Sequence, residues 1–460
     1  MLFSSLVFLF TFLPITLLVY YLVPRKVKNV VLLIASLIFY AWGEPVYIFL
    51  MLISILFNYF CGMDIALKAG RKSQVRSLIF TIVVNLFILG FFKYYGFIVT
   101  NLNAILPFYI PYRKLELPIG ISFYTFQTLS YIIDVYRGNV DVQVNLIDFG
   151  TYVTMFPQLI AGPIVQYADV ERQLRERKES LTKFGYGAWF FVIGLAKKVL
   201  LANTIGSIYE NIAAMDGMSV VTAWLGCLAY TFQIYFDFSG YSDMAVGLGK
   251  MFGFEFMQNF NYPYISKSVT EFWRRWHISL GSWFREYVYI PLGGNRVTVP
   301  RHLLNLLIVW FLTGLWHGAS WNFVLWGIVL LFFILLEKFC IGSFLKKHAL
   351  LSHLYLLFVI PPTWVIFRIT KLSDVGAYFT RLFPFFGTHS AVSAQDALKL
   401  LSSYWWLLLL GILFCLPQPR RFFEKHRGTP LIDLPLFVLF WVCVYFIATS
   451  TGNAFLYSRF

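Results

Sequence analysis

One histidine, His317, stands inside a long apolar stretch. Apolar residues precede it from Leu303 and resume after it at Phe323. If a helix enters the membrane near His302, about fourteen residues at ~1.5 Å each carry the chain roughly 20 Å inward. The hydrocarbon core is about 30 Å thick, so His317 should lie at membrane depth. An ionisable residue there is a functional candidate by default; a structural histidine that ties two helices together is the alternative.

The surroundings of His317 indicate which chemistry it could perform. Desolvation disfavours imidazolium, so the ring should stay neutral. A neutral ring can take a proton from a hydroxyl nucleophile, which is the task of a general base. Gly314 and Gly318 bracket the histidine, and we expect another chain segment or a substrate to approach the backbone closely there.

A second histidine, His277, follows a charged segment that is rich in tryptophan. Ser268 and Glu271 have the spacing of a capping box, which predicts a helix that starts there and continues past His277. On this helix Glu271 should pair with Arg275, while His277 lies on the aromatic face. His277 is then either a packed histidine bonded to a carbonyl or part of a cytoplasmic entrance. In the second case Arg274 and Arg275 could hold an anionic donor.

Two carboxylates, Asp237 and Asp243, lie in another long apolar segment. Unpaired carboxylates at membrane depth would be neutralised or very costly. We therefore predict a structural network that pairs these acids with Arg274, Arg275 or Arg285, with a channel-lining or proton-relay role as the alternative. Beyond them, Asn259, Asn261 and Pro263 have the composition of a turn that leads to the His277 helix.

The elements that must position these residues follow from the composition. Of the 460 residues, 59% are apolar and 13% are charged, whereas an ordinary globular protein has about 25% charged residues. This composition excludes disorder, a coiled coil and a nucleic-acid-binding domain, and it indicates an integral membrane protein. The formal net charge of +15 comes mostly from short gaps between apolar runs, where it reports topology. The five cysteines form no C-x-x-C pair, and we interpret them as buried free thiols.

The apolar runs predict an all-α polytopic bundle. A spanning helix needs about 20 mostly apolar residues, and several runs are too short or too interrupted. We therefore expect about eleven transmembrane helices plus re-entrant or interfacial pieces. The candidate spans are 2–23, 29–42, 46–67, 77–99, 118–136, 147–165, 184–212, 219–250, 303–316, 319–339, 352–369, 398–416 and 431–449. Breaks at Pro118, Gly120, Pro157 and Gly162 favour an interior passage.

Charges between the runs suggest an orientation. The first run has no basic residue ahead of it, and Arg25, Lys26 and Lys28 follow it, so we predict an anchor with its N-terminus outside. The charged stretch 169–183 should form a helix of about four turns on the cytoplasmic face, either as a solvated surface or as a docking surface. The whole chain should form one transmembrane domain, with N-terminal helices (1–110), a catalytic core (117–340) and C-terminal helices (352–460).

Several motifs together resemble the membrane-bound O-acyltransferase family, in its alginate O-acetyltransferase-like branch. The motifs are FPQLIAGPIVQY (156–167), FDFSGYSDMAVGLGKMFGF (236–254), NFNYPYISKSVTEFWRRWHISLGSWFREYVYIPLGGNR (259–296) and FLTGLWHGASWNFVLWG (311–327). The resemblance implies a helix bundle around a central tunnel. It implies that His317, in the W-H-G motif, is catalytic, and that His277, in the R-R-W-H motif, is a second important histidine.

The resemblance also suggests a reaction. Acetyl-CoA would dock on the cytoplasmic side of a bacterial inner membrane, near Lys267, Arg274 and Arg275. The acceptor hydroxyl would come from an extracytoplasmic polysaccharide or from the serine of a partner acyltransferase. Other residues expected to line the donor site or tunnel are Trp276, Trp316 and Asn322, and those expected in the structural polar network are Asp237, Asp243 and Glu271. We expect no tightly bound cofactor, no metal and no nucleic acid.

Two alternatives to acetyl transfer remain at this stage. A relative in the same family that passes D-alanine from a carrier protein to teichoic acid would carry the same histidines. A secondary transporter would also have broken helices and buried acids.

Overall fold

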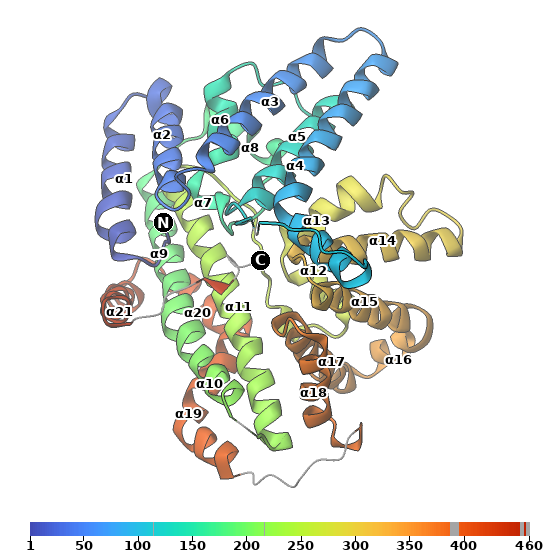
Figure 1. The fold of residues 1–460 in the computed structure, drawn as a ribbon. Helices are drawn as coiled ribbons and strands as arrows, with labels where there is room; N and C mark the ends of the chain where they lie inside the picture. The colour runs from blue at the N-terminus through green and yellow to red at the C-terminus, as the bar shows by residue number, and fades with distance from the viewer. Residues whose placement is uncertain (114, 216, 387–394, 451–454, 457–460) are drawn as a thin grey trace. The chain divides into compact units, whose positions relative to one another are not determined.

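The computed structural model describes residues 1–113, 115–215, 217–386, 395–450 and 455–456. All regular elements in these ranges are helices (Figure 1), which confirms the prediction of an all-α polytopic protein. Eight helices in the described ranges are long and apolar enough to cross a membrane, so the predicted number of about eleven spans is not confirmed. Their bounds are Ile48–Leu67, Arg71–Ile105, Leu181–Ala213, Val299–His317, Trp321–Lys347, Ala349–Arg368, Gln395–Phe414 and Pro430–Thr449.

The described chain divides into two compact units. The first comprises Met1–Phe191 and Tyr241–Gln258, and the second comprises Val192–Gly240 and Asn259–Leu456. Both predicted histidines belong to the second unit. The proposed arrangement of 1–110, 117–340 and 352–460 within one domain stays a prediction.

The first unit contains the helices of residues 1–176. α3 (Ile48–Leu67), α4 (Arg71–Ile105) and α5 (Ile121–Arg137) lie side by side (Figure 1). The others are α1 (Leu13–Leu22), α2 (Lys28–Ala41), α6 (Leu146–Thr154), α7 (Phe156–Leu159) and α8 (Tyr167–Glu176). α5 begins directly after Gly120, whose φ is 76°, and the predicted span 147–165 is divided into α6 and α7. The breaks expected at Gly120 and Pro157 are therefore confirmed.

The charged stretch 169–183 differs from its prediction. α8 ends at Glu176, so the helix is shorter than four turns. Arg177 is buried: its Nε donates to the Tyr20 hydroxyl at 3.0 Å and to the carbonyl of Phe252 at 3.1 Å. Its guanidinium also lies 4.3 Å from the centroid of the Phe254 ring. The segment leaves the helix at this point because Arg177 finds its partners inside the unit.

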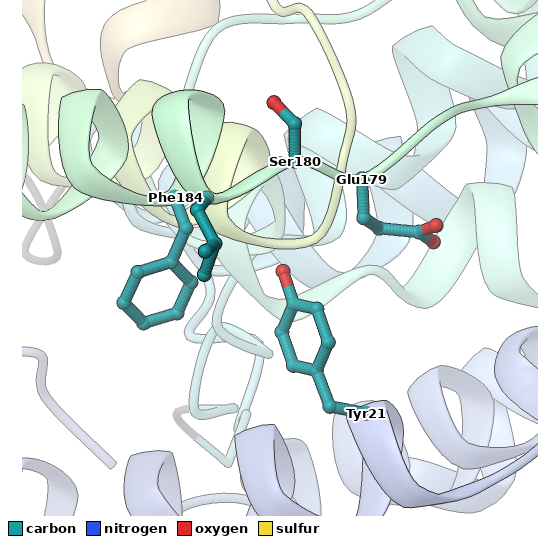
Figure 2. A pocket seen from close by; sticks show the side chains of 5 residues that line it. Tyr21, Glu179, Ser180 and Phe184 are labelled. Carbon is teal, nitrogen blue, oxygen red and sulfur yellow. The ribbon is translucent and has the colours of Figure 1, made fainter.

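Glu179, two residues after Arg177, pairs with cations near the start of the chain. Its carboxylate accepts a hydrogen bond from the Tyr20 hydroxyl at 2.6 Å and lies 3.3 Å from both Arg25 and Lys28. Beside it a pocket of about 370 Å³ is lined by Tyr21, Glu179, Ser180, Leu181 and Phe184. Figure 2 shows the Glu179 carboxylate pointing away from the Phe184 ring. This part of 169–183 is an internal ion network and not a solvated face.

The second unit holds the remaining helices. They are α10 (Asn203–Ala213), the first part of α11 (Val220–Met251), α12 (Val269–Arg275), α13 (Ile278–Phe284), α14 (Val299–His317), α15 (Trp321–Leu336), α16 (Gly342–Lys347), α17 (Ala349–Arg368), α18 (Leu372–Leu382), α19 (Gln395–Phe414), α20 (Pro417–Lys425) and α21 (Pro430–Thr449). α9 (Leu181–Ala196) begins in the first unit and ends in the second.

α14 and α15 pack side by side in the second unit (Figure 1). A Cβ atom at Gly314 would lie 2.4 Å from the carbonyl oxygen of Phe323, and one at Gly318 would lie 2.3 Å from the Phe323 ring. Any side chain at these positions would push the two helices apart. The predicted close approach of another segment near His317 is confirmed, and the segment is the first turn of α15.

Asp237 of α11 is paired with Lys198 and not with the arginines that we predicted. Both side chains are buried, with 2% of each exposed, and the Lys198 ammonium contacts the Asp237 carboxylate directly. The second carboxylate oxygen accepts a hydrogen bond from the amide of Leu456 at 2.9 Å. Lys198 lies in a π-helical turn, Lys197–Ala202, within a run that is otherwise apolar.

We expect Lys198→Met to destabilise the protein by about 3–5 kcal/mol, because it leaves the Asp237 carboxylate buried without its cation. Combining it with Asp237→Leu should recover most of the loss, since no buried charge then remains. Thermal unfolding of the two purified variants in detergent measures both effects. A double variant as unstable as Lys198→Met would contradict this account.

Candidate functional site

The predicted helix around His277 is two helices with a break at the histidine. α12 ends at Arg275 and α13 begins at Ile278, while His277 has φ 45° and ψ 54°. The carbonyl of Arg275 accepts from the amide of Asn261, and the amide of Ile278 donates to the carbonyl of Asn259, both at 2.9 Å. The helix breaks because its backbone bonds to the 259–261 loop. A non-glycine residue with positive φ is uncommon and often marks a functional site.

The predicted start of this segment is correct. Ser268 accepts a hydrogen bond from the Glu271 amide at 3.0 Å, and α12 begins at Val269. Glu271, however, returns to the amide of Lys267 at 2.9 Å and not to that of Ser268. The predicted pair is also present, with 2.9 Å between Arg275 Nη2 and the Glu271 carboxylate.

Asn259 fixes the protonation of the His277 ring. Its Oδ1 accepts from the amide of Ser279 at 3.2 Å and from the Ser279 hydroxyl at 2.9 Å. Because a backbone amide can only donate, the Asn259 atom at this position is the oxygen. The same oxygen lies 3.2 Å from His277 Nδ1, so Nδ1 carries the hydrogen. Nε2 of the neutral ring is therefore the basic nitrogen.

His277 is buried, with 2% of its surface exposed, as the aromatic face of its helix predicted. Burial lowers its pKa to about 3, which leaves the imidazole neutral at physiological pH. The ring lies edge-on to Phe238, with 4.7 Å between centroids, and 5.8 Å from the ring of Trp316. The interpretation of His277 as a packed histidine expected a bond to a carbonyl. The partner is the side-chain carbonyl of Asn259.

His317 closes α14 and lies in a cage of aromatic rings. Only 4% of it is exposed, and its ring centroid lies 5.0 Å from that of Trp316 and 5.1 Å from those of Trp326 and Phe367. Trp316 also contacts His277. The structure therefore brings the two predicted histidines, 40 positions apart in the sequence, against the same indole.

Two further predicted residues support this cage. Asn322 is fully buried and donates to the carbonyls of Ile366 at 3.1 Å and Phe367 at 3.0 Å, which ties α15 to the end of α17. Trp276 stacks on Phe272 at 5.5 Å and lies 4.7 Å from Trp364. Their predicted contacts with a donor stay predictions.

The predicted basic residues take different positions. Arg275 binds Glu271 and also donates to the carbonyl of Asn261 at 3.2 Å, and Arg285 lies 3.7 Å from Glu286. Arg274 and Lys267 instead line a groove of about 1080 Å³ between α12, α14 and α16. Asp243 belongs to the first unit, whereas Asp237 and Glu271, the other members predicted for the polar network, belong to the second.

The groove contains residues that the sequence interpretation missed. His302, Lys338 and Lys346 line it together with Tyr289 and Glu337. The three basic residues lie near the ends of apolar runs, where a basic residue is expected for topology alone. The sequence therefore gave no separate sign that they share a groove.

The cysteines are free thiols, as predicted, but not all are buried. Cys227, Cys415 and Cys443 are buried and Cys61 is half-buried, whereas Cys340 is exposed. Cys340 lies on the wall of the groove, after the apolar part of its helix has ended.

Comparison with known proteins shows to which family this chain belongs. Residues 34–370 match the family model of the membrane-bound O-acyltransferases. The chain belongs to the membrane-bound O-acyltransferase family. It is accordingly a multi-pass membrane protein and an O-acyltransferase.

Three relatives indicate how far the likeness extends. The probable alginate O-acetylase AlgI of Azotobacter vinelandii is 42% identical over 95% of this chain and 90% of its own length. The peptidoglycan O-acetyltransferase of Helicobacter pylori is 31% identical over 100% of this chain and 98% of its own. The teichoic acid D-alanyltransferase of Bacillus subtilis is 28% identical over 46% of this chain and 56% of its own length.

Proposed function

We propose that this membrane-bound O-acyltransferase moves an acetyl group from cytoplasmic acetyl-CoA to a hydroxyl of an extracytoplasmic polysaccharide of the alginate type. The hydroxyl belongs either to the polymer itself or to the serine of a partner acyltransferase that acetylates the polymer afterwards. Two relatives named for acetylation of a glycan align over nearly the whole chain. The D-alanyltransferase aligns over less than half of it, which favours acetyl transfer over D-alanyl transfer.

The observation that carries the proposal is the convergence of His277 and His317 on the Trp316 indole. In the proposed reaction the acceptor oxygen attacks the thioester carbonyl while His317 takes the hydroxyl proton. The carbon–sulfur bond then breaks, and the proton passes from His317 to the leaving thiolate. No net proton is consumed, and neither ATP nor a metal ion takes part.

The second histidine has a narrower role in this proposal. Because Asn259 holds the hydrogen on Nδ1, His277 offers Nε2 as a hydrogen-bond acceptor. An acceptor beside Trp316 can orient the attacking hydroxyl or share its proton with His317. The aromatic cage, in which 4% of His317 is exposed, keeps water away from the thioester.

The donor side of the proposal rests on charge. Lys267 and Arg274 line the groove, so two of the three predicted donor residues are available to an anionic ligand there. Arg275 holds Glu271 and the 259–261 loop and acts as a positioning residue for His277. The proposed orientation, with the N-terminus outside an inner membrane, follows from Arg25, Lys26 and Lys28 behind the first apolar run.

Purified protein incubated with radiolabelled acetyl-CoA and a polysaccharide acceptor, with and without a periplasmic serine acyltransferase, tests the function directly. We expect label to pass to the polymer or to the partner's serine. Carrier-bound D-alanine supplied in a parallel reaction should leave no label on the acceptor. Transfer of D-alanine without transfer of acetyl would overturn the proposal.

A further inference from the structure

The pocket of about 370 Å³ beside the end of α1 has an apolar part and a charged part. Its lining belongs to the first unit. In Figure 2 the Phe184 ring lies on one side of the Tyr21 ring, and the Glu179 carboxylate lies on the other. Leu181 lines the pocket together with Phe184. A ligand of this pocket must therefore be amphipathic.

Three cations surround the one carboxylate of the charged part. Glu179 Oε1 lies 3.3 Å from both Arg25 Nη1 and Lys28 Nζ, and 4.0 Å from Arg177 Nε. Among the described residues, no other carboxylate lies within ion-pair distance of these three cations. Three positive charges against one negative charge leave a formal surplus of two.

The cations also have donors to spare. Arg177 Nη2 is buried without a hydrogen-bond partner among the described residues. Arg25 Nη2 reaches the carbonyls of Gln173 and Leu174 only at 3.5 and 3.4 Å, which is long for a hydrogen bond. The Arg25 side chain is 35% exposed, so its guanidinium can take a further anionic acceptor. A phosphate group is such an acceptor.

Lys28 brings positive charge to the pocket itself. Its ammonium lies 3.3 Å from Glu179 and 5.3 Å from the centroid of the Tyr21 ring, and both of these residues line the pocket. The Tyr21 ring is fixed in turn, because its hydroxyl donates to the carbonyl of Met251 at 2.6 Å. The cation and the apolar lining are therefore held beside each other before any ligand binds.

The pocket lies where membrane helices end. The apolar helix Phe8–Leu22 ends one residue after Tyr21, and the candidate span Leu181–Ala213 begins at a residue that lines the pocket. Leu181 is 91% exposed, so its side chain is open to the lipid. Basic residues gathered at the ends of membrane helices attract the headgroups of anionic lipids.

We propose that this pocket binds one anionic phospholipid. Its phosphate lies between Arg25 and Lys28, and the start of an acyl chain lies against Leu181 and Phe184. The formal surplus of two positive charges favours a lipid with a net negative charge over a zwitterionic one, whose ammonium group the cations repel. The site does not depend on the proposed function, because its residues take no part in the transfer of an acyl group.

Native mass spectrometry of the full-length protein tests the charge of the ligand. Phosphatidylglycerol or phosphatidylcholine with the same acyl chains is added to the protein in detergent. We expect one phosphatidylglycerol to bind about tenfold more tightly than phosphatidylcholine. Arg25→Gln should remove this preference, while Glu179 keeps Lys28 and Tyr20 as partners. Lys26→Gln is the matched control, because Lys26 is the exposed neighbour of Arg25 and makes no ion pair with Glu179.

Leu181→Trp tests the apolar part without changing any charge. The larger side chain should occupy the pocket and weaken binding of phosphatidylglycerol about tenfold, and thermal unfolding near the wild-type temperature would exclude a folding defect. Glycerophosphoglycerol, the headgroup without acyl chains, should not displace the lipid at the same concentration. Displacement by this headgroup, or wild-type binding in Leu181→Trp, would show that no acyl chain lies in the pocket. Equal binding of the two lipids, or equal effects of Arg25→Gln and Lys26→Gln, would reduce the site to a generally basic surface and overturn the proposal.

Discussion

His317→Ala should lower the rate of acyl transfer by about 10²–10⁴-fold, the contribution that a positioned general base makes. The substitution removes the ring that, under the proposed mechanism, accepts the hydroxyl proton, while the groove that we assign to the donor is unchanged. We expect the variant to insert in the membrane and to bind coenzyme A as the wild type does. The measurement is transfer of labelled acetyl groups, normalised to the amount of folded protein.

A loss of activity in His317→Ala could also come from the cavity left among Trp316, Trp326 and Phe367. His317→Phe separates the two causes, because phenylalanine fills the cage but cannot accept a proton. We expect His317→Phe to unfold near the wild-type temperature and to be as inactive as His317→Ala. His348→Ala, at an exposed histidine outside the site, should keep full activity. Wild-type rates in His317→Phe would remove His317 from the mechanism.

The position of His317 could be predicted from sequence because it depends on one helix. The run from Leu303 to His317 is apolar and has helical length, and α14 spans Val299–His317. Gly314 and Gly318 indicated a close approach for a local reason, the absence of Cβ atoms. Phe323 could not be identified as the approaching residue without the geometry of the turn between α14 and α15, which the sequence does not reveal.

The break at His277 could not be predicted, because it arises where the preceding 259–261 loop folds back and bonds to the middle of the segment. The 268–284 segment has the composition of one helix, and its N-cap at Ser268 was predicted from residues three apart. The amides and carbonyls that bond to Asn259 and Asn261 belong to a tertiary contact. Asn259 itself was recognised only as a turn residue, because nothing in its neighbourhood shows that its Oδ1 meets His277.

The partner of Asp237 illustrates the same limit. Buried charge requires a counter-charge, and that part of the prediction was sound. Lys198 lies 39 positions away in an apolar run, and only the packing of two helices brings the pair together. The stretch 169–183 was likewise expected to form one helix on the cytoplasmic face, as a solvated or a docking surface. The partners of Arg177 within it, Tyr20 and Phe252, come from distant parts of the chain.

Asn259→Leu should lower the acyl transfer rate about tenfold to a hundredfold. The leucine removes the oxygen that holds the hydrogen on His277 Nδ1, and a buried donor without a partner costs about 1–3 kcal/mol. At ~1.4 kcal/mol for each factor of ten, this cost gives the expected range. The ring can then adopt the other tautomer, in which Nε2 no longer accepts a hydrogen bond.

Asn259→Asp distinguishes this positioning role from simple packing through the pH dependence. In the wild type, burial lowers the pKa of His277 to about 3, so the ring stays neutral above that pH and should add no acid limb between pH 5 and 8. A carboxylate at position 259 still accepts from Nδ1, but it stabilises imidazolium and raises the pKa of His277 toward its ordinary value near 6.5. The variant should therefore approach wild-type rates at pH 8 and lose activity progressively as the pH falls through the raised pKa. A pH–rate profile parallel to that of the wild type would show that the protonation of His277 does not matter to the reaction, and Asn259 would then be a residue of the fold alone.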